Sequence, residues 1–305
     1  MSGTALVTGA WGFIGRHAAQ RLARAGWTVS GIGHGRFDDA ARDAWGVREF
    51  VTADVTLAGL AGCGAKPDLI VHCAGGSTVG YSVTHPLEDF ERTVATTAAV
   101  LEFARTGARG ARVVFLSSAA VYGEAGSLPL REDAMLAPVS PYGVHKRIGE
   151  DLCRLYGAKF EVPSVIVRFF SVYGPGMRKQ LLWDAGQRLR SGERSFGGTG
   201  KETRDWLHVE DAASLIERAQ AMASVVCPVI NGGTGSGVSV AQVLGELFSA
   251  LGSAESPRFT GSLRQGDPQA LVADISKALA TGWRPQIRWQ DGVRGYAAWL
   301  REAAA

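Results

Sequence analysis

Short apolar runs alternate with longer amphipathic stretches along the first half of the chain. The runs are rich in Val and Ile, as in buried strands, whereas the stretches between them repeat their apolar residues at the spacing of a helix. This alternation predicts an α/β fold, a Rossmann-type doubly wound parallel sheet with helices on both faces. The predicted strands are 5–8, 28–32, 49–52, 69–72, 112–117 and 164–169, and the predicted helices are 12–25, 86–105 and 141–156.

Beyond residue 170 the alternation becomes irregular, and the sequence Gly174-Pro175-Gly176 breaks the chain. The remaining pattern predicts a cofactor-binding domain over 1–170 with a returning segment at 207–235. It predicts a smaller, discontinuous C-terminal substrate lobe over 171–206 and 236–305. Helices are predicted at 180–190, 210–221 and 239–251, a strand at 226–231, and a short strand and two helical segments in the tail from 258.

The composition is that of a globular protein, with 46% hydrophobic residues, 20% charged residues and a formal net charge of only +3. There is no Lys/Arg stripe with interleaved aromatic residues, so the sequence does not indicate a nucleic-acid partner. No apolar stretch is long enough for a membrane span and the first residues lack the charged start of a signal peptide, so we expect a cytoplasmic protein. The cysteines are scattered and the histidines show no ligand spacing, which predicts neither disulfides nor a metal site.

A glycine-rich turn joins the first predicted strand to the first predicted helix. Its first glycine permits a sharp turn, its second lets the backbone approach a pyrophosphate, and its third allows close helix–strand packing. The helix N-terminus adds free N–H groups and the positive end of a dipole. Glycine-rich turns are common, but at this junction the pattern predicts a dinucleotide site made by Gly9, Gly12, Phe13, Ile14 and Gly15.

The choice between NAD and NADP depends on the end of the second strand. An NAD site usually has an acidic residue there for the adenosine ribose, and this chain has none near Gly33. His34 and Arg36 would suit the 2′-phosphate of NADP, or they are exposed loop residues. Asp54 and Val55 follow the third strand and suit the adenine ring. We expect NAD, and NADP stays open.

Tyr142 and Lys146 lie four residues apart, on one face of a predicted helix. A tyrosine has a pKa of about 10 and is a poor base at neutral pH. A nearby ammonium group and a positive nicotinamide ring favour the phenolate, so we predict a lowered pKa for Tyr142. Ser118, at the end of the fifth strand, would hold the reacting oxygen of the substrate. A Y-x-x-x-K pair alone is a frequent chance match, but here it accompanies the glycine-rich turn and a Ser-rich strand end.

These motifs give the chain a resemblance to a known family. It resembles the extended short-chain dehydrogenase/reductases, in particular the NAD-dependent sugar epimerase/dehydratase group, over nearly its whole length. The motifs that carry the resemblance are 8–15, 72–75, 117–123, 142–146, 168–175, 204–209 and 264–268.

The resemblance implies a nucleotide-diphosphate sugar as substrate and a role for each matching residue. Tyr142 is the expected acid/base, Lys146 binds the nicotinamide ribose, and Ser118 positions the reacting oxygen. Many relatives dimerise through a four-helix contact, so we expect a homodimer formed by helices 86–105 and 141–156. Ala74, Gly75 and Phe169 would line the cofactor. The residues expected to bind the substrate are Ser77, Ser171, Arg204, Arg264 and Asp267. Of these, the two arginines would hold the diphosphate and Asp267 would lie near the nucleoside.

The chain also departs from the family pattern. Ser171 stands where many relatives carry Asn, and Thr93 stands where an Asn usually supports the active-site helix. Family dehydratases place an Asp-Glu pair directly after the catalytic Ser/Thr, whereas this chain has Ala119 and Ala120. A methyl group transfers no proton, so a 4,6-dehydratase is not expected.

The leading hypothesis is therefore a nucleotide-sugar 4-epimerase, with UDP as the default nucleotide. It would oxidise carbon 4 transiently with a tightly bound nicotinamide. The first alternative is an NADPH-dependent reductase of a nucleotide 4-keto-6-deoxysugar, which the missing ribose acid and Arg36 favour. The second is a non-catalytic NAD(P)-binding protein, which ranks behind because the Ser–Tyr–Lys set is complete.

Overall fold

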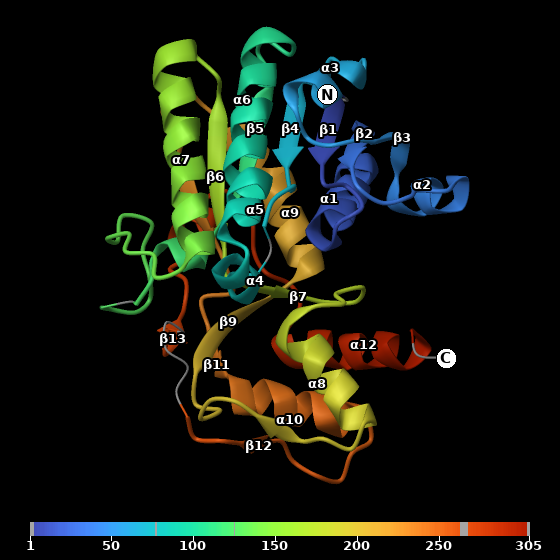
Figure 1. Ribbon diagram of the computed structural model, residues 1–305, viewed down its shortest axis with the longest axis vertical. Coiled ribbons are helices and arrows are strands. Elements are labelled where there is room, and N and C mark those ends of the chain that lie inside the picture. The colour runs from blue at the N-terminus through green and yellow to red at the C-terminus, as the bar shows by residue number, and fades with distance from the viewer. Residues whose placement is uncertain (1–2, 77, 125, 263–267, 304–305) are drawn as a thin grey trace.

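The computed structural model describes residues 3–76, 78–124, 126–262 and 268–303. Its larger part is built on a seven-stranded sheet in the order β10-β6-β5-β4-β1-β2-β3, and every neighbouring pair is parallel (Figure 1). This confirms the predicted Rossmann-type fold. The strands are β1 (Thr4–Thr8), β2 (Thr28–Gly33), β3 (Val47–Thr52), β4 (Leu69–His72), β5 (Arg112–Ser118), β6 (Ser164–Phe169) and β10 (Val229–Gly232).

Helices cover both faces of this sheet because alternate strand residues point to opposite sides. Val7 and Val71 pack with α1 and α9, whereas their neighbours Leu6 and Ile70 pack with α3, α6 and α7. The second face is the one toward the viewer in Figure 1. The helices of this part are α1 (Phe13–Arg24), α2 (Asp39–Trp45), α3 (Leu57–Gly62), α4 (Val79–Thr84), α5 (Pro86–Phe90), α6 (Thr96–Thr106), α7 (Pro141–Phe160), α9 (Val209–Ala219) and α11 (Ser276–Ala280), with short 3₁₀ turns η2 (Ala119–Val121) and η3 (Gln220–Met222).

The predicted helix 86–105 is not one regular α-helix. It is α5 and α6 joined by a π-helical turn, η1 (Glu91–Ala95). Hydroxyl groups compete here for backbone acceptors: Thr97 Oγ1 donates to the carbonyl of Thr93 at 2.5 Å, and Thr96 Oγ1 donates to that of Arg92 at 2.6 Å. Such turns are frequent at functional sites, and here the hydroxyl of Thr93 contacts the loop after β4.

The smaller part lies below the large sheet in Figure 1 and has its own core. Tyr173, Leu247 and Tyr296 are buried together there. The chain forms a four-stranded sheet of β11, β9, β13 and β7, and a pair of β12 and β8. The elements are β7 (Ser171–Tyr173), β8 (Ser195–Phe196), β9 (Thr203–His208), β11 (Gly237–Ser239), β12 (Arg258–Phe259), β13 (Ala270–Leu271), α8 (Gln180–Arg190), α10 (Val240–Ala250) and α12 (Trp289–Glu302).

Two sequence-based expectations for the second half need correction. The strand predicted at 226–231 begins only at Val229, because Cys227 has a φ of 50° and cannot be part of a strand. The described residues of the tail form two short strands, β12 and β13, where one was predicted. Within the described ranges, every helix is too short or too polar to cross a membrane.

Candidate active site

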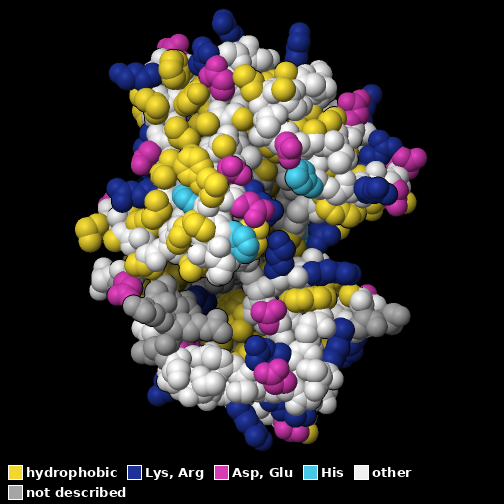
Figure 2. All heavy atoms as spheres, in the orientation of Figure 1, with side chains coloured by type: hydrophobic (Ala, Val, Ile, Leu, Met, Phe, Trp, Pro, Cys, Tyr) yellow, Lys and Arg dark blue, Asp and Glu magenta, His cyan; other side chains and the backbone are white. Residues whose placement is uncertain are grey.

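A cavity of about 2140 Å³ lies where the carboxyl ends of the parallel strands face the smaller part. Gly9 after β1, Cys73 after β4 and Ser118 at the end of β5 all line it. Figure 2 shows the hollow between the two parts, with Lys and Arg side chains along it. Doubly wound sheets bind their ligands at this edge, so the cavity is the candidate active site.

The glycine-rich turn forms a cradle with no side chains in the way. A Cβ at Gly9, which has a φ of 66°, would lie 2.8 Å from the backbone nitrogen of Ala74. A Cβ at Gly15 would lie 2.1 Å from the carbonyl oxygen of Gly9. Gly12 caps α1 without a side-chain hydrogen bond, and the first turn of α1 has no acidic residue. Free N–H groups at the positive end of a helix suit a pyrophosphate, so these residues fit a dinucleotide.

The adenosine end differs from the predicted arrangement. Gly33 ends β2 with a φ of 150°, and a Cβ there would lie 3.2 Å from Cα of Gly9. His34 Nε2 lies 2.6 Å from Asp54 Oδ1, and both side chains are exposed. His34, Asp54 and Val55 line the cavity, but Arg36 is exposed and does not. The structure therefore brings three of the four predicted residues together and leaves Arg36 outside.

Ser118, Tyr142 and Lys146 converge at the bottom of the cavity. Ser140 caps α7 by accepting a hydrogen bond from the N–H of Gly143 at 3.2 Å, and this sets the first turn that carries Tyr142. The hydroxyl of Ser118 lies close enough to the Tyr142 phenol to lower its pKa. Lys146 Nζ lies 5.8 Å from the ring centre of Tyr142 and donates to the carbonyl of Leu116 at 2.9 Å. The three side chains are thus close enough to act on one substrate oxygen.

The protein's own groups raise the pKa of Tyr142. Burial raises it, the hydrogen bond from Ser118 lowers it, and the charge of Asp89 raises it again, with a net upward shift. Among the protein's own groups, burial and the charge of Asp89 outweigh the effect of Ser118. The predicted lowering also invoked a positive nicotinamide ring, so for the cofactor-bound protein it stays a prediction. Burial also lowers the pKa of Lys146 to about 8, against the opposing effect of Asp89.

A buried hydrogen-bond chain supports the loop after β4. Burial lowers the pKa of His72 to about 3, so its imidazole is neutral. The Thr97 hydroxyl donates to the Thr93 carbonyl and therefore accepts from His72 Nε2 at 3.1 Å. His72 Nδ1 then accepts from the Thr8 hydroxyl at 2.7 Å, and Thr8 accepts from the N–H of Ala74 at 3.2 Å. These hydrogen bonds hold the loop at Ala74. Ala74 and the next residue, Gly75, line the cavity, as predicted.

Thr93 takes part in the same support. Its hydroxyl accepts a hydrogen bond from the N–H of Gly76 at 2.9 Å, and its side chain is buried. Where the family pattern led us to expect Asn, the Thr93 hydroxyl therefore holds the loop after β4.

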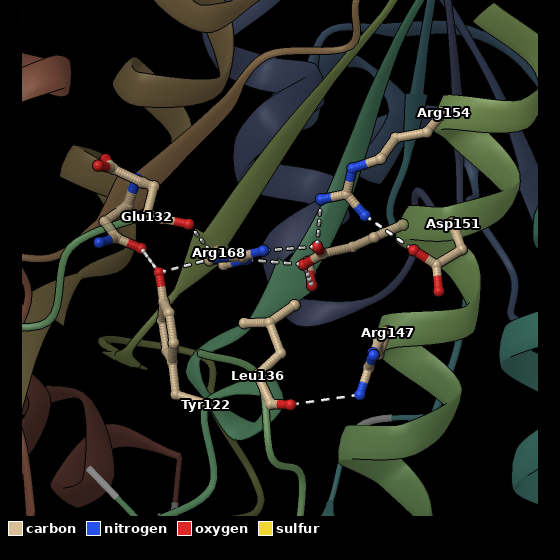
Figure 3. Close-up of polar contacts among 10 residues, drawn as sticks. Tyr122, Glu132, Leu136, Arg147, Asp151, Arg154 and Arg168 are labelled. Atoms are coloured by element: carbon tan, nitrogen blue, oxygen red, sulfur yellow. Dashed lines mark hydrogen bonds and ion pairs between the residues drawn. The ribbon is translucent and has the colours of Figure 1, made fainter. Parts of the chain in front are cut away.

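A second buried network ties β5, β6 and α7 together behind the site (Figure 3). Arg168 donates to both oxygens of Glu150, from Nε at 2.8 Å and from Nη2 at 2.7 Å. Ser117 donates to Glu150 Oε1 at 2.7 Å, and Arg168 Nη1 donates to the Tyr122 hydroxyl at 3.0 Å. Tyr122 donates in turn to Asn231 Oδ1 at 2.7 Å. The strand end that presents Ser118 is thereby held against the helix that presents Tyr142.

The predicted substrate residues are only partly described. Ser171 and Arg204 line the cavity, as does Phe169 of the predicted cofactor set. Ser77, Arg264 and Asp267 lie outside the described residues.

Sequence reasoning missed four cations that line the same cavity, Arg16, Arg92, Arg178 and Lys179. Arg16 Nη2 donates to the carbonyl of Gly176 at 2.7 Å, which links α1 to the smaller part. Arg178 lies 5.8 Å from the ring centre of Trp299. Arg16 was open to prediction, since it directly follows the glycine-rich turn, but the position of Arg178 depends on the packing of α12. No cluster of three or more possible metal ligands occurs in the part of the chain that the structure describes.

This fold and cavity define a Rossmann-fold, nicotinamide-dependent enzyme. The chain belongs to the NAD dependent epimerase/dehydratase family, whose pattern it matches over residues 5–228. This confirms the resemblance to extended short-chain dehydrogenase/reductases.

Individual relatives agree with this assignment. The chain is 33% identical to the UDP-glucose 4-epimerase of Azospirillum brasilense, covering 97% of this chain and 91% of that protein. The solved UDP-glucuronic acid 4-epimerase from Bacillus cereus, in complex with UDP-glucuronic acid and NAD, has a TM-score of 0.87 at 27% identity, over 98% of this chain and 99% of that one. The UDP-glucose 4-epimerase of Thermus thermophilus, in complex with NAD, has a TM-score of 0.87 at 28% identity, over 98% of this chain and 99% of that one.

Proposed function

We propose that the protein is a nucleotide-sugar 4-epimerase that acts on a UDP-sugar with a tightly bound NAD. One observation carries the proposal: the complete Ser118, Tyr142 and Lys146 set stands beside two methyl groups, Ala119 and Ala120, in a cavity at the dinucleotide cradle. Relatives of known structure that share this fold hold NAD with a UDP-sugar, which supports the choice of both ligands.

The residues of the site have complementary tasks in this reaction. Tyr142 would take the proton from the 4-hydroxyl of the sugar and later return it, while Ser118 holds the same oxygen. Lys146 would bind the cofactor ribose and favour the Tyr142 phenolate. A bound nicotinamide would supply a hydride acceptor and donor for carbon 4 and a positive charge near the Tyr142 phenol. The ketone must turn over between the two transfers, and the small side chains of Ala119 and Ala120 leave room for that.

Arg204 and Arg264 would hold the substrate diphosphate, as the family pattern implies. Asp267 would lie near the nucleoside. Ser77 and Ser171 would face the sugar. Arg204 lies in β9 at the cavity wall, which agrees with such a role. We assign the cofactor to a domain of residues 1–170 and 207–235, and the substrate nucleotide to the lobe of residues 171–206 and 236–305.

A second candidate is an NADPH-dependent reductase of a nucleotide 4-keto-6-deoxysugar. The observation in its favour lies at the end of β2. Neither Gly33 nor His34 has a carboxylate there that would repel a ribose 2′-phosphate. Against it, His34 Nε2 lies 2.6 Å from Asp54 Oδ1, so the imidazole already has a carboxylate as its partner. A non-catalytic NAD(P)-binding protein is less favoured, because such a role needs no Tyr142–Lys146 pair.

The protein is proposed to work as a cytoplasmic homodimer. Large hydrophobic side chains are exposed on the face of α5 and α7, where Figure 2 shows a gathering of hydrophobic atoms. Burying them against a second copy would remove them from water. Sedimentation equilibrium would test this, and a monomer at all concentrations would contradict it. The residues concerned are Leu87, Phe90, Val144, Leu155 and Phe160.

The identity of the bound cofactor distinguishes the epimerase from the reductase. The purified protein is denatured, and any released nicotinamide is identified by chromatography and mass spectrometry. Near-stoichiometric NAD supports the epimerase, whose cofactor is reduced and reoxidised within one turnover. A protein that takes up NADPH and releases NADP in the presence of a 4-keto-6-deoxysugar nucleotide would support the reductase instead.

A further inference from the structure

Asp89 and His145 form a buried pair that neither the sequence analysis nor the proposed mechanism uses. Asp89 lies near the end of α5 and is fully buried, and its Oδ2 lies 2.6 Å from His145 Nδ1 on α7. A carboxylate can only accept, so Nδ1 carries the proton of this bond. The second oxygen, Oδ1, is buried and has no hydrogen-bond partner among the residues that the structure describes.

The pair lies directly behind the catalytic residues. His145 precedes Lys146 in α7 and follows Tyr142 by three residues, one helical turn. Asp89 and Lys146 also press against two consecutive glycines that line the cavity. A Cβ at Gly76 would lie 1.9 Å from Asp89 Oδ1, and a Cβ at Gly75 would lie 3.3 Å from Lys146 Nζ.

The hydroxyl of Thr93 lies beside the same two glycines. It would lie 3.1 Å from a Cβ at Gly76 and 3.7 Å from a Cβ at Gly75. The carboxylate of Asp89 and the ammonium of Lys146 therefore approach neighbouring glycines of one short loop, and the Thr93 hydroxyl lies near both glycines.

The other groups around Lys146 do not supply a free negative charge. Burial raises the pKa of Cys73, beside β4, to about 12, so it is a neutral thiol at working pH. Glu150, one turn further along α7, is bound through both oxygens by Arg168 and also by Arg154. His72 on β4 is neutral because burial lowers its pKa to about 3.

Tyr142, on the same helix as Lys146, is a phenol with a raised pKa, mainly because of burial. Asp89 is thus the one carboxylate facing Lys146, among the described residues, whose charge no arginine offsets. Burial lowers the pKa of Lys146 to about 8, and Asp89 is the foremost of the groups that oppose this.

We propose that Asp89, held in place by His145, is a positioning residue that keeps Lys146 in its ammonium form. The inference rests on the proposed roles of Tyr142 and Lys146. Without a counter-charge, a buried ammonium loses its proton more easily. A neutral Lys146 would no longer favour the Tyr142 phenolate, so the effect of Asp89 on the reaction passes through Lys146.

The test measures the titration of Lys146 directly. The full-length protein, saturated with NAD, is labelled with ¹³C-lysine, and the ¹³Cε shift of Lys146 is followed against pH. Its signal is identified by its loss in Lys146→Arg. In Asp89→Asn the titration midpoint should fall on the order of one pH unit. In His145→Gln, whose amide can still donate to the carboxylate, the midpoint should stay close to that of the unsubstituted protein.

Two further variants separate charge from packing. Asp211→Asn alters another buried carboxylate, which accepts from the N–H groups of Gln286 and Ile287, and should not move the Lys146 midpoint. If Asp89→Asn alone does not fold, Asp89→Asn/His145→Gln replaces the pair by two hydrogen-bonding amides and should lower the midpoint in the same way.

An unchanged midpoint in a folded variant without the Asp89 charge would overturn the proposal and leave Asp89 a packing element. The readout needs no turnover. A shifted midpoint in a protein without epimerase activity would therefore contradict the proposed function alone.

Discussion

The hydroxyl of Ser118 acts to lower the pKa of the Tyr142 phenol, although Ser118 ends β5 and Tyr142 lies in the first turn of α7. Two buried supports fix this relationship. The ion pair of Glu150 and Arg168 joins α7 to the strands, and Ser82 Oγ accepts from the N–H of Tyr142 at 3.0 Å. A rigid mutual position of hydroxyl and phenol is what proton transfer at one substrate oxygen requires.

Replacing Tyr142 by Phe removes the acid/base but keeps the ring. We expect the turnover rate to fall by roughly 10²–10⁴-fold, the usual contribution of general acid–base catalysis, while NAD stays bound. Steady-state kinetics on the accepted sugar nucleotide give the rate, and cofactor release gives the occupancy. Tyr156→Phe on the same helix, where the hydroxyl donates only to Glu102, is the matched control and should remain active. Near-full activity in Tyr142→Phe would refute the assignment.

Replacing Ser118 by Ala should move the pH profile. The hydrogen bond from Ser118 lowers the pKa of Tyr142, so its loss raises that pKa further. The acidic limb of the pH–rate profile, which reports formation of the phenolate, should therefore shift to higher pH. Ser117→Ala removes the neighbouring hydroxyl, which donates to Glu150, and should leave this limb in place. Equal profiles in both variants would show that Ser118 does not act on Tyr142.

Replacing Arg168 by Met removes the buried partner of Glu150 and leaves only Arg154, whose side chain is partly exposed, to offset its charge. Breaking a buried pair in this way costs about 3–5 kcal/mol of unfolding free energy, measurable by urea denaturation at pH 7. The double variant Glu150→Leu/Arg168→Met should recover much of the loss, because it removes both charges. A single variant as stable as the parent protein would mean that the network in Figure 3 contributes nothing.

The same pair gives the stability a defined pH dependence. Burial raises the pKa of Glu150, but the hydrogen bonds and charge of Arg168 outweigh it and the net shift is downward. The stabilisation is therefore fully present above the unfolded pKa of about 4.3 and is lost as the pH falls through the lower folded pKa. Glu150→Gln should show a shallower loss of stability in acid than the parent protein, as denaturation at several pH values would reveal.

Replacing Gly12 by Ala tests the cradle. Its φ is −64°, so the backbone tolerates a side chain, and the new Cβ would lie 3.0 Å from the carbonyl of Gly9, on the face offered to the pyrophosphate. We expect the Kd for NAD to rise about tenfold or more, measured by calorimetry on protein freed of cofactor. Gly245→Ala in α10 meets nothing within 4 Å and should bind NAD normally. Unchanged affinity in Gly12→Ala would place the pyrophosphate elsewhere.

The sequence predicted those parts of the site whose residues lie close together along the chain. Gly9, Gly12 and Gly15 stand at a strand–helix junction, and Tyr142 and Lys146 share one helix face, so spacing alone indicates where they lie. Short strands such as β7 and β11 were missed because three residues carry no readable periodicity. The π-helical turn at Thr93 was missed because its cause is local competition for backbone acceptors.

The electrostatic partners could not be predicted from spacing. Asp89 and His145 are 56 positions apart, and Ser117 and Glu150 are 33 apart, so only the packing of α5 and β5 against α7 brings them together. For the same reason the upward effect of burial on the Tyr142 pKa could not be predicted: the sequence shows the nearby lysine but not how deeply the phenol is buried.

The measurement that tests the central claim most directly is inversion at carbon 4 without net oxidation. The protein, purified without added cofactor, is incubated with UDP-sugars such as UDP-glucose and UDP-glucuronic acid, and the products are separated by chromatography and identified by NMR. We predict interconversion of the two C4 epimers of one of these sugars, with no stoichiometric consumption of nicotinamide, and no interconversion in Tyr142→Phe. A 4-keto-6-deoxy product, or turnover only with stoichiometric NADPH, would contradict the assignment as an epimerase.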